Sequence, residues 1–405
     1  MTRARAAGPR ARERLVTRVK RLRVGVLYGG RSSEHEISVA SAAAIFANLD
    51  RQRYEAVPIR IEKDGRWRLA DRPPSAASAA EVIEQTRTDP RVRGGREVYL
   101  PPRPGEDTLM VVDRRKEGGN NHDTEVVGIV TGLSLDVLFP VLHGPYGEDG
   151  TIQGLLELAN VPYVGCGVLS SAVGMDKAVM KVLFRARGLP VPDWITVTRR
   201  DWEAERGQMT DRIARELGSP LFIKPANLGS SVGISKVHHP GELHDAMALA
   251  LGYDLKAVVE QAVPDAREIE CAVLGNADPI ASVPGEIVPS REFYDYQAKY
   301  LDSGSRTEVP AALDEATAET VRRLALDAFI AIDGAGLARV DFLLSRSSGQ
   351  LFLNEINTLP GFTTISMYSK LWAASGLDYA TLVDRLIALA LDRHAEKQAI
   401  KTSVI

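Results

Sequence analysis

The sequence has few of the features that mark secreted, membrane-spanning or nucleic-acid-binding proteins. Its 405 residues include only two cysteines, Cys166 and Cys271, which lie in separate segments without a CxxC spacing or a histidine nearby. This usage favours reduced thiols in a cytoplasmic protein over disulfides or structural zinc. No apolar run approaches the ~20 residues that a membrane-spanning helix needs. The 50 basic and 53 acidic side chains leave a net charge of −3, which gives no electrostatic footprint for nucleic acid.

Two common nucleotide-binding motifs are also missing. Gly29-Gly30 follows an expected strand but does not extend to GxGxxG, and the chain contains no GxxxxGK[ST]. The strand leads through this turn into an amphipathic helix, with Ser33 and Glu36 at the spacing of a capping box. Such a junction suits an anion or a nucleotide-like ligand, although a plain tight turn fits as well. Glu34, in the first helical turn, could hold a substrate amine or only complement the helix dipole.

The overall pattern predicts an α/β protein. Strand-like apolar runs alternate with amphipathic helices, so we expect a mixed or antiparallel sheet to carry the later motifs. The length allows two or three domains. The basic residues 1–21 are expected to form a flexible extension, because charges interrupt the apolar core that a signal peptide needs. The Pro-, Arg- and Gly-rich residues 71–127 predict a long surface excursion with one hairpin, formed by REVYLPP and TLMVVD.

The most informative stretch is a predicted β-hairpin over residues 337–357, two apolar runs joined by Arg-Ser-Ser-Gly. Side chains alternate between faces along a strand, so Arg339 and Asp341 share one face of the first run. Glu355 and Asn357 share one face of the second run. Adjacent strands would bring two carboxylates, a carboxamide and a guanidinium together, which suggests a Mg²⁺ site with bound phosphates. A surface hairpin with a salt-bridged outer face is the alternative.

A second phosphate-binding pattern lies upstream, in the sequence LFIKPANLGSSVGISKV at residues 221–237. An apolar strand there ends at Lys224, and a Gly-Ser-Ser-x-Gly loop follows. Glycine lets backbone N–H groups approach phosphate oxygens, and the lysine adds a point charge. A polar hairpin turn is the alternative. Glu260 and Glu268, in the two strand-like runs that come next, could supply acids for an adenine and its ribose.

Three further features carry less weight when taken alone. His143 follows a buried apolar strand and precedes a glycine-rich turn and a helix, an active-site-like placement in α/β proteins. Isolated histidines, however, are more often structural. Lys177 lies on a helix, where lysines are usually solvated. Residues 291–305 could form a mobile lid over an anionic ligand or a partner-binding loop, and their candidate side chains are Tyr294, Tyr296, Tyr300 and Lys299.

Taken in order, these segments resemble the D-alanine–D-alanine ligases, members of the ATP-grasp superfamily. The resemblance runs from Leu22 to Asp392, and its segments are GGRSSEHEIS, HGPYGEDGTIQGLLE, PYVGCG, MDK, IKPANLGSSVG, FYDYQAKY, ARVDF and NEINTLPGFT. It implies an ATP-grasp fold in which an N-terminal α/β domain precedes two sheet-containing subdomains that clasp ATP. The implied boundaries are 22–164, 165–263 and 264–393, with an extension at 1–21 and a tail at 394–405.

The resemblance also implies an activity. Two D-alanines would be ligated to D-alanyl-D-alanine through a D-alanyl phosphate, with release of ADP and phosphate, for peptidoglycan precursor synthesis. ATP and two Mg²⁺ ions, replaceable by Mn²⁺, would be required. The partners would be small molecules, with no nucleic acid or membrane, and the protein would be a cytoplasmic homodimer joined through its N-terminal domain. One alternative is a sister ligase that uses D-lactate or D-serine, although the segment FYDYQAKY is the form expected of the D-alanine enzymes. The other alternative is a non-catalytic ATP-binding regulator.

Roles for individual residues follow from the same resemblance. The ATP-binding set would comprise Lys177, Lys224, Ser230, Ser231 and Lys299 at the phosphates and Glu260 and Glu268 at the adenine and ribose. The metal-binding set would comprise Asp341, Glu355 and Asn357. The substrate-binding set would comprise Glu34, His143, Tyr294, Arg339, Gly361 and Ser366. The catalytic set would comprise a lid-closing triad, Glu34, Ser230 and Tyr300, and an oxyanion site formed by Arg339 and the backbone N–H of Gly361.

Overall fold

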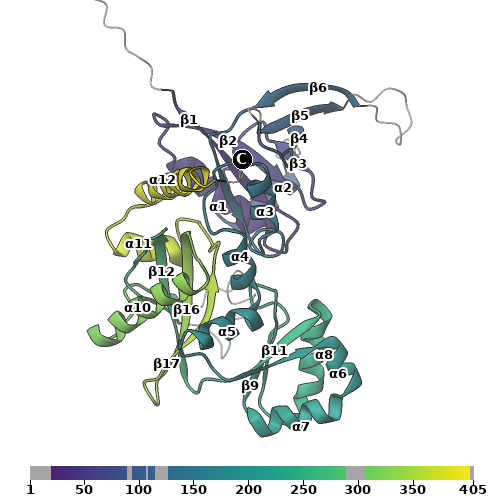
Figure 1. Cartoon of the computed structure of the whole chain (residues 1–405), viewed down its shortest axis with the longest axis vertical. Helices are drawn as coiled ribbons and strands as arrows, with labels where there is room; N and C mark the ends of the chain where they lie inside the picture. Colours follow the sequence, from purple (N-terminus) through teal and green to yellow (C-terminus); the bar gives the residue numbers. More distant parts are fainter. Residues whose placement is uncertain (1–19, 89–93, 106–107, 115–125, 289–305, 402–405) are drawn as a thin grey trace, which may run out of the picture.

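The computed structural model of the chain describes residues 20–88, 94–105, 108–114, 126–288 and 306–401. Within these ranges the strands form three β-sheets flanked by helices (Figure 1). The α/β class predicted from the alternating pattern is confirmed. None of the described helices is long and apolar enough to cross a membrane. The expected lid side chains lie outside the described residues: Tyr294, Lys299 and Tyr300.

The first sheet has the strand order β6-β5-β4-β3-β2-β1-β7. Its parallel strands are β1 (Leu22–Gly29), β2 (Tyr54–Ile61) and β7 (Val137–Leu142). Its antiparallel strands are β3 (Trp67–Leu69), β4 (Arg96–Tyr99), β5 (Leu109–Arg114) and β6 (Val126–Leu133). The helices of this region are α1 (His35–Asn48), α2 (Ala79–Thr88) and α3 (Thr151–Leu158). Because β1 and β7 are parallel neighbours, the turns after them, which hold Glu34 and His143, lie at the same sheet edge.

The prediction of a surface excursion over residues 71–127 is wrong. The predicted hairpin is present as β4 and β5, but these strands and β6 extend the first sheet. Val98, Leu109 and Val111 are buried, with 0–1% of their surface exposed. Alternating polar residues along these short strands hid the inward-facing apolar side chains, so the composition suggested a loop.

The predicted capping box at the start of α1 is also absent. The residue that caps the helix is Glu34 rather than Ser33, and its side chain makes no capping hydrogen bond. Glu36 instead forms a 2.7 Å ion pair with Lys63, from the loop after β2. A tertiary partner therefore replaced the local one that the spacing suggested.

The second sheet is antiparallel, with the order β10-β9-β11-β8. Its strands are β8 (Trp194–Thr198), β9 (Leu221–Pro225), β10 (Ser235–Val237) and β11 (Lys256–Gln261). Helices α4 (Val168–Met175) and α5 (Lys177–Ala186) precede it. The helices that follow are α6 (Arg199–Ala204), α7 (Arg206–Glu216) and α8 (Leu243–Tyr253), with a 3₁₀ turn η2 (Pro240–Glu242). Apolar side chains of α7 and α8 pack with the sheet in one cluster.

The third sheet is antiparallel, with the order β15-β14-β12-β16-β17 and β13 paired to β12. Its strands are β12 (Ala266–Gly275), β13 (Ile280–Ala281), β14 (Gly285–Val288), β15 (Arg306–Glu308), β16 (Gly336–Ser345) and β17 (Leu351–Asn357). Helix α10 (Glu315–Ala331) packs on one face, against residues such as Cys271 and Val340. The alternation along β12 and β16 leaves Glu270, Arg339 and Asp341 on the other face.

One hydrophobic cluster joins the first sheet to the third. It contains Val24 and Phe139 from the first sheet, Leu274 from β12, and Leu382 and Leu386 from the last helix. That helix, α12 (Tyr379–Gln398), lies beside α1, and α11 (Met367–Ala374) precedes it (Figure 1). The shared cluster fixes the turns at the edge of the first sheet against the polar face of the third.

Candidate active site

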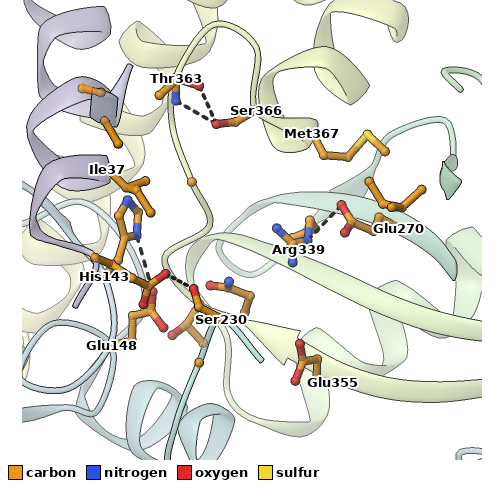
Figure 2. A pocket seen from close by; sticks show the side chains of 18 of the residues that line it. Ile37, His143, Glu148, Ser230, Glu270, Arg339, Glu355, Thr363, Ser366 and Met367 are labelled. Carbon is orange, nitrogen blue, oxygen red and sulfur yellow. Dashed lines mark hydrogen bonds and ion pairs between the residues drawn. The ribbon is translucent and has the colours of Figure 1, made fainter. Parts of the chain in front are cut away.

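A cavity of about 390 Å³ lies where these turns meet the polar face of the third sheet (Figure 2). Its polar lining comes from all parts of the chain and includes Glu34, His143, Glu148, Lys177, Ser230, Glu270, Arg339, Glu355, Asn357, Gly361 and Ser366. Nine of these are site residues expected from the sequence. Segments up to about 330 residues apart therefore contribute to one pocket.

The hairpin has the expected pairing. In the register of β16 and β17, Arg339 lies opposite Asn357 and Asp341 lies opposite Glu355, with a bulge directly after Asp341. Residues directly opposite in an antiparallel pair project to the same face, so the four polar groups do gather on one side of the ribbon. Asp341 is 9% exposed, which rules out a solvent-facing hairpin.

Arg339 is held by two carboxylates. Its Nε lies 2.7 Å from Asp341 Oδ1, and its Nη2 lies 2.7 Å from Asp341 Oδ2. Its Nε also lies 3.1 Å from Glu270 Oε2, on the adjacent strand β12. Burial alone would lower the pKa of Arg339, but the charges of Asp341 and Glu270 outweigh it and hold the pKa well above its ordinary value. The pocket therefore contains a permanent, fixed positive charge.

Lys177 brings a second cation to the cavity from the start of α5. Asp176 caps this helix and forms an ion pair with Lys256 of β11. The Nζ of Lys177 donates a 2.9 Å hydrogen bond to the Leu228 carbonyl and lies 3.4 Å from Glu355 Oε2. Lys177 therefore contacts both the β16–β17 hairpin, through Glu355, and the loop after β9, through Leu228.

A third group of charges lies between the second sheet and helix α5, outside the lining of the cavity. Lys224 Nζ lies 3.0 Å from Glu260 Oε1 and 3.1 Å from Asn354 Oδ1. Lys181 Nζ lies 2.6 Å from the other Glu260 oxygen. Burial would raise the pKa of Glu260, but the two lysines outweigh it and lower the pKa, so the carboxylate stays ionised. Burial lowers the pKa of Lys181.

The loop between β9 and β10 reaches the first sheet. Ser230 donates a hydrogen bond to the carboxylate of Glu34. Both Ser230 and Ser231 have positive φ angles, 53° and 57°. Non-glycine residues avoid this conformation, and such strain concentrates at functional sites. Two members of the expected triad therefore meet, while its third member lies outside the described residues.

His143 is buried at the same edge, with 4% of its surface exposed. Its Nδ1 lies 3.0 Å from the Leu359 carbonyl and 3.5 Å from Glu148 Oε1, and within the described residues its Nε2 has no hydrogen-bond partner. Burial would lower the pKa of His143, but the hydrogen bond with Glu148 and the charges of Glu148 and Glu34 outweigh it and raise the pKa. Burial raises the pKa of Glu148.

The segment after β17 returns along the cavity. Ser366 Oγ accepts a 3.0 Å hydrogen bond from the Thr363 backbone and lies 2.7 Å from Thr363 Oγ1. Phe362, 2% exposed, packs against Tyr368 and other aromatic rings and fixes the backbone beside Gly361. A Cβ atom at Gly361 would lie 3.3 Å from Ser366 Oγ, so any larger residue here would crowd this serine.

Three side chains at or near the site were not predicted from the sequence. Five predicted site residues do not line the cavity: Lys224, Ser231, Glu260, Glu268 and Asp341. Glu148, Lys181 and Glu270 have no predicted role, although Glu148 and Glu270 line the pocket. Alternation in REIECAVL puts Glu270 on the face of Glu268, and helical spacing puts Lys181 one turn beyond Lys177, so both signals were present.

The donor set of the hairpin fits a magnesium site. Within the described residues, no cluster of three or more His, Cys, Asp or Glu side chains is placed to hold a metal ion. Asp341, Glu355 and Asn357 offer instead two carboxylates and a carboxamide on one face. Mg²⁺ prefers oxygen ligands and takes only one or two carboxylates when substrate phosphates complete its shell.

Comparisons with known proteins agree along the chain. The family model for the D-ala D-ala ligase N-terminus matches residues 23–166, and the model for the D-ala D-ala ligase C-terminus matches residues 183–388. The D-alanine–D-alanine ligase of Heliobacterium modesticaldum is 48% identical over 93% of this chain and 96% of its own length. That of Geobacillus kaustophilus is 46% identical over 93% of this chain and 97% of its own length.

Solved structures give the same result. The D-alanine–D-alanine ligase from Coxiella burnetii is 38% identical, with a TM-score of 0.76 over 94% of this chain and 97% of that one. The VanG D-Ala:D-Ser ligase from Enterococcus faecalis is 33% identical, with a TM-score of 0.77 over 92% of this chain and 100% of that one. The chain therefore belongs to the D-alanine–D-alanine ligase family, and it is a ligase with the ATP-grasp fold.

Proposed function

We propose that this protein joins two D-alanines to D-alanyl-D-alanine at the expense of ATP, through a D-alanyl phosphate, in peptidoglycan precursor synthesis. One observation carries the proposal. Lys177, at the start of helix α5, and Glu355, on strand β17 of the third sheet, are 178 positions apart in the sequence. They lie 3.4 Å from each other at a cavity that also contains Arg339. This supports the proposal, which needs a cation for phosphate, a carboxylate for a metal ion and a guanidinium for an oxyanion at one site.

ATP would lie between the second and third sheets. In this proposal Lys177 and Lys224 contact its phosphates, and the loop of Ser230 and Ser231 covers them with backbone N–H groups. Glu260 and Glu268 serve the adenine and ribose. Lys224 donates a hydrogen bond to Glu260 in this structure. On nucleotide binding its ammonium group would turn from Glu260 towards the phosphates.

The β16–β17 hairpin would provide the ligands of the metal ions. Asp341, Glu355 and Asn357 would hold two Mg²⁺ ions, for which Mn²⁺ could substitute. When bound, these ions neutralise charge on the phosphates and so lower the barrier to phosphoryl transfer. Arg339 contacts both oxygens of Asp341 in this structure, and that contact must loosen for Asp341 to serve as a metal ligand.

The first D-alanine would bind through both of its charges. Glu34 would hold its ammonium group, and His143 would lie near its carboxylate, with Nε2 available as a donor when the ring is protonated. A carboxylate is a poor electrophile, so one of its oxygens first takes the γ-phosphoryl group of ATP, and ADP leaves. Lid closure by Tyr294, Lys299 and Tyr300, which stays a prediction, would keep water from this acyl phosphate.

The second D-alanine would bind with its carboxylate at Ser366. Its free amine attacks the acyl carbon, the new C–N bond forms, and phosphate leaves with the oxygen to which it was attached, while the amine loses its proton. Arg339 and the Gly361 N–H would stabilise the oxyanion that develops in this step. Each donor of this kind typically lowers the barrier by about 2.7–4 kcal/mol.

Mass spectrometry of the product tests the proposal. The protein is incubated with ATP, Mg²⁺ and D-alanine, alone or mixed with D-lactate or D-serine. We expect D-alanyl-D-alanine as the main product in every mixture. A main product that ends in D-lactate or D-serine would instead assign a sister ligase, and no product from a folded protein would contradict the activity. The domain boundaries, the cytoplasmic location and the homodimer stay predictions.

A further inference from the structure

Glu270 lines the cavity but has no role in the proposed reaction. It lies on β12, directly opposite Asp341 in the antiparallel register. Its side chain is 11% exposed. Carboxylates directly opposite each other on neighbouring strands repel, and burying a charge is costly unless it is paired. The pair therefore needs a cation between its members.

Arg339 is that cation, and it contacts Asp341 and Glu270 with different geometry. Its contacts with Asp341 are a pair of 2.7 Å hydrogen bonds. Its contact with Glu270 is an ion pair, with Nε 3.1 Å from Oε2, that lacks the geometry of a hydrogen bond. Figure 2 shows the two side chains facing each other at the edge of the cavity. Glu270 thus acts on Arg339 mainly through its charge.

The proposed reaction requires the contacts of Arg339 to change. If Asp341 is a metal ligand, its oxygens turn from Arg339 to the metal in the loaded enzyme. Arg339 then loses its hydrogen-bonding partner in the state in which its guanidinium must be fixed near the reacting carbon. Among the described residues, Glu270 is the other carboxylate within ion-pair distance of Arg339.

We propose that Glu270 is a positioning residue, which holds the guanidinium of Arg339 beside the cavity when Asp341 engages the metal. This role rests on the proposed function. In this role Glu270 acts through Arg339 rather than directly on the substrates. Without its charge, the guanidinium can follow Asp341 or rotate away, and the oxyanion loses its stabilisation for part of the time. The proposed contacts of Lys177 and Lys224 with ATP do not involve this guanidinium and stay unchanged.

Substitution of Glu270 tests the role. Glu270→Gln keeps the size and removes the charge. We expect kcat to fall at least about tenfold while KM for ATP changes by less than about twofold. Glu270→Asp keeps the charge and should retain more activity than Glu270→Gln. The matched control is Glu286→Gln on β14 of the same sheet, a buried carboxylate paired with Arg267 and absent from the cavity lining. This control should retain the wild-type kcat.

A double-mutant cycle separates positioning from direct action. If Glu270 works only through Arg339, Glu270→Gln has no further effect on kcat in an Arg339→Ala background. Calorimetric titration with ADP and Mg²⁺ should give the same affinity for wild type and Glu270→Gln, and thermal unfolding should show that both are folded. Multiplying effects in the double variant, or wild-type kcat in Glu270→Gln, would overturn the role. A folded wild type that releases no phosphate would refute the proposed function, and this role with it.

Discussion

The Nζ of Lys177 lies 3.4 Å from Oε2 of Glu355. Lys177 begins α5, whose cap Asp176 pairs with Lys256 of the second sheet, whereas Glu355 lies on the last strand of the third sheet. Their contact closes the space between the two sheets at the cavity. The proposed phosphate-binding lysine and the proposed metal-binding carboxylate neutralise each other in this structure, and charged ligands would replace this pairing.

Removal of the lysine tests the phosphate site. Lys177→Ala should weaken ATP binding about 10–100-fold, since a hydrogen bond to a charged group contributes roughly 1.5–3 kcal/mol. Calorimetric titration with ATP measures the change. The control is Lys397→Ala, which removes a half-exposed lysine that pairs with Glu157 on another face. Equal affinities of the wild type and Lys177→Ala would exclude Lys177 from the nucleotide site.

The oxyanion site makes a different prediction. Arg339→Ala should lower kcat about 10²–10³-fold, while ATP affinity stays nearly constant, because the guanidinium acts on charge that develops during the reaction. Steady-state kinetics and ATP titration provide the two readouts. Arg346→Ala, at the exposed end of the same hairpin, should behave as wild type. Undiminished turnover in Arg339→Ala would refute the role.

Much of this site could be predicted from the sequence because strand alternation has a period of two. The shared face of Arg339, Asp341, Glu355 and Asn357 follows from that period and needs only the correct pairing. The placement of Glu34 and His143 follows similarly from the rule that parallel strands end at one sheet edge. These side-chain positions depend on the geometry of single strands and their ends, so they can be predicted from the local sequence.

The remaining features depend on contacts between distant segments. The importance of Glu270 becomes visible only when β12 pairs with β16 and places it beside Arg339. Lys181, on helix α5, is buried against Glu260, which lies 79 positions later in the sequence on strand β11. The expected capping box failed for the same reason, since Glu36 found a tertiary partner. No spacing within a single segment encodes such pairings.

The pairing of His143 with Glu148 predicts a pH dependence. The pKa of His143 is raised in the folded protein, so the protonated ring stabilises the fold fully below its unfolded pKa of about 6.5. This stabilisation is lost as the pH rises through the higher folded value. Glu148→Gln removes the partner and should lower the pKa of His143, which histidine NMR titration measures in the ligand-free protein. An unchanged pKa in Glu148→Gln would contradict the pairing, and His239→Gln, at an exposed histidine, is the control.

The aromatic cluster below Gly361 predicts a large effect on stability. The ring of Phe362 lies 5.3 Å from Tyr379, 5.7 Å from Tyr368 and 5.9 Å from Phe139, between centroids. Phe362→Ala should lower the free energy of unfolding by about 3–5 kcal/mol, as urea denaturation can determine. Ile330→Ala, at a side chain that is 53% exposed, should change it by less than about 0.5 kcal/mol. Equal effects of the two substitutions would contradict this packing.

The most direct test of the whole account is phosphate release by the purified wild-type protein. Release should require ATP, D-alanine and Mg²⁺ together, stop when EDTA removes the metal, and resume when Mg²⁺ is restored. This is expected because, in the proposed function, the lysines and the metal-binding oxygens of the hairpin act on the same triphosphate. Release that ignores D-alanine, or none from a folded protein supplied with all three, would contradict the assignment of this cavity as a ligase active site.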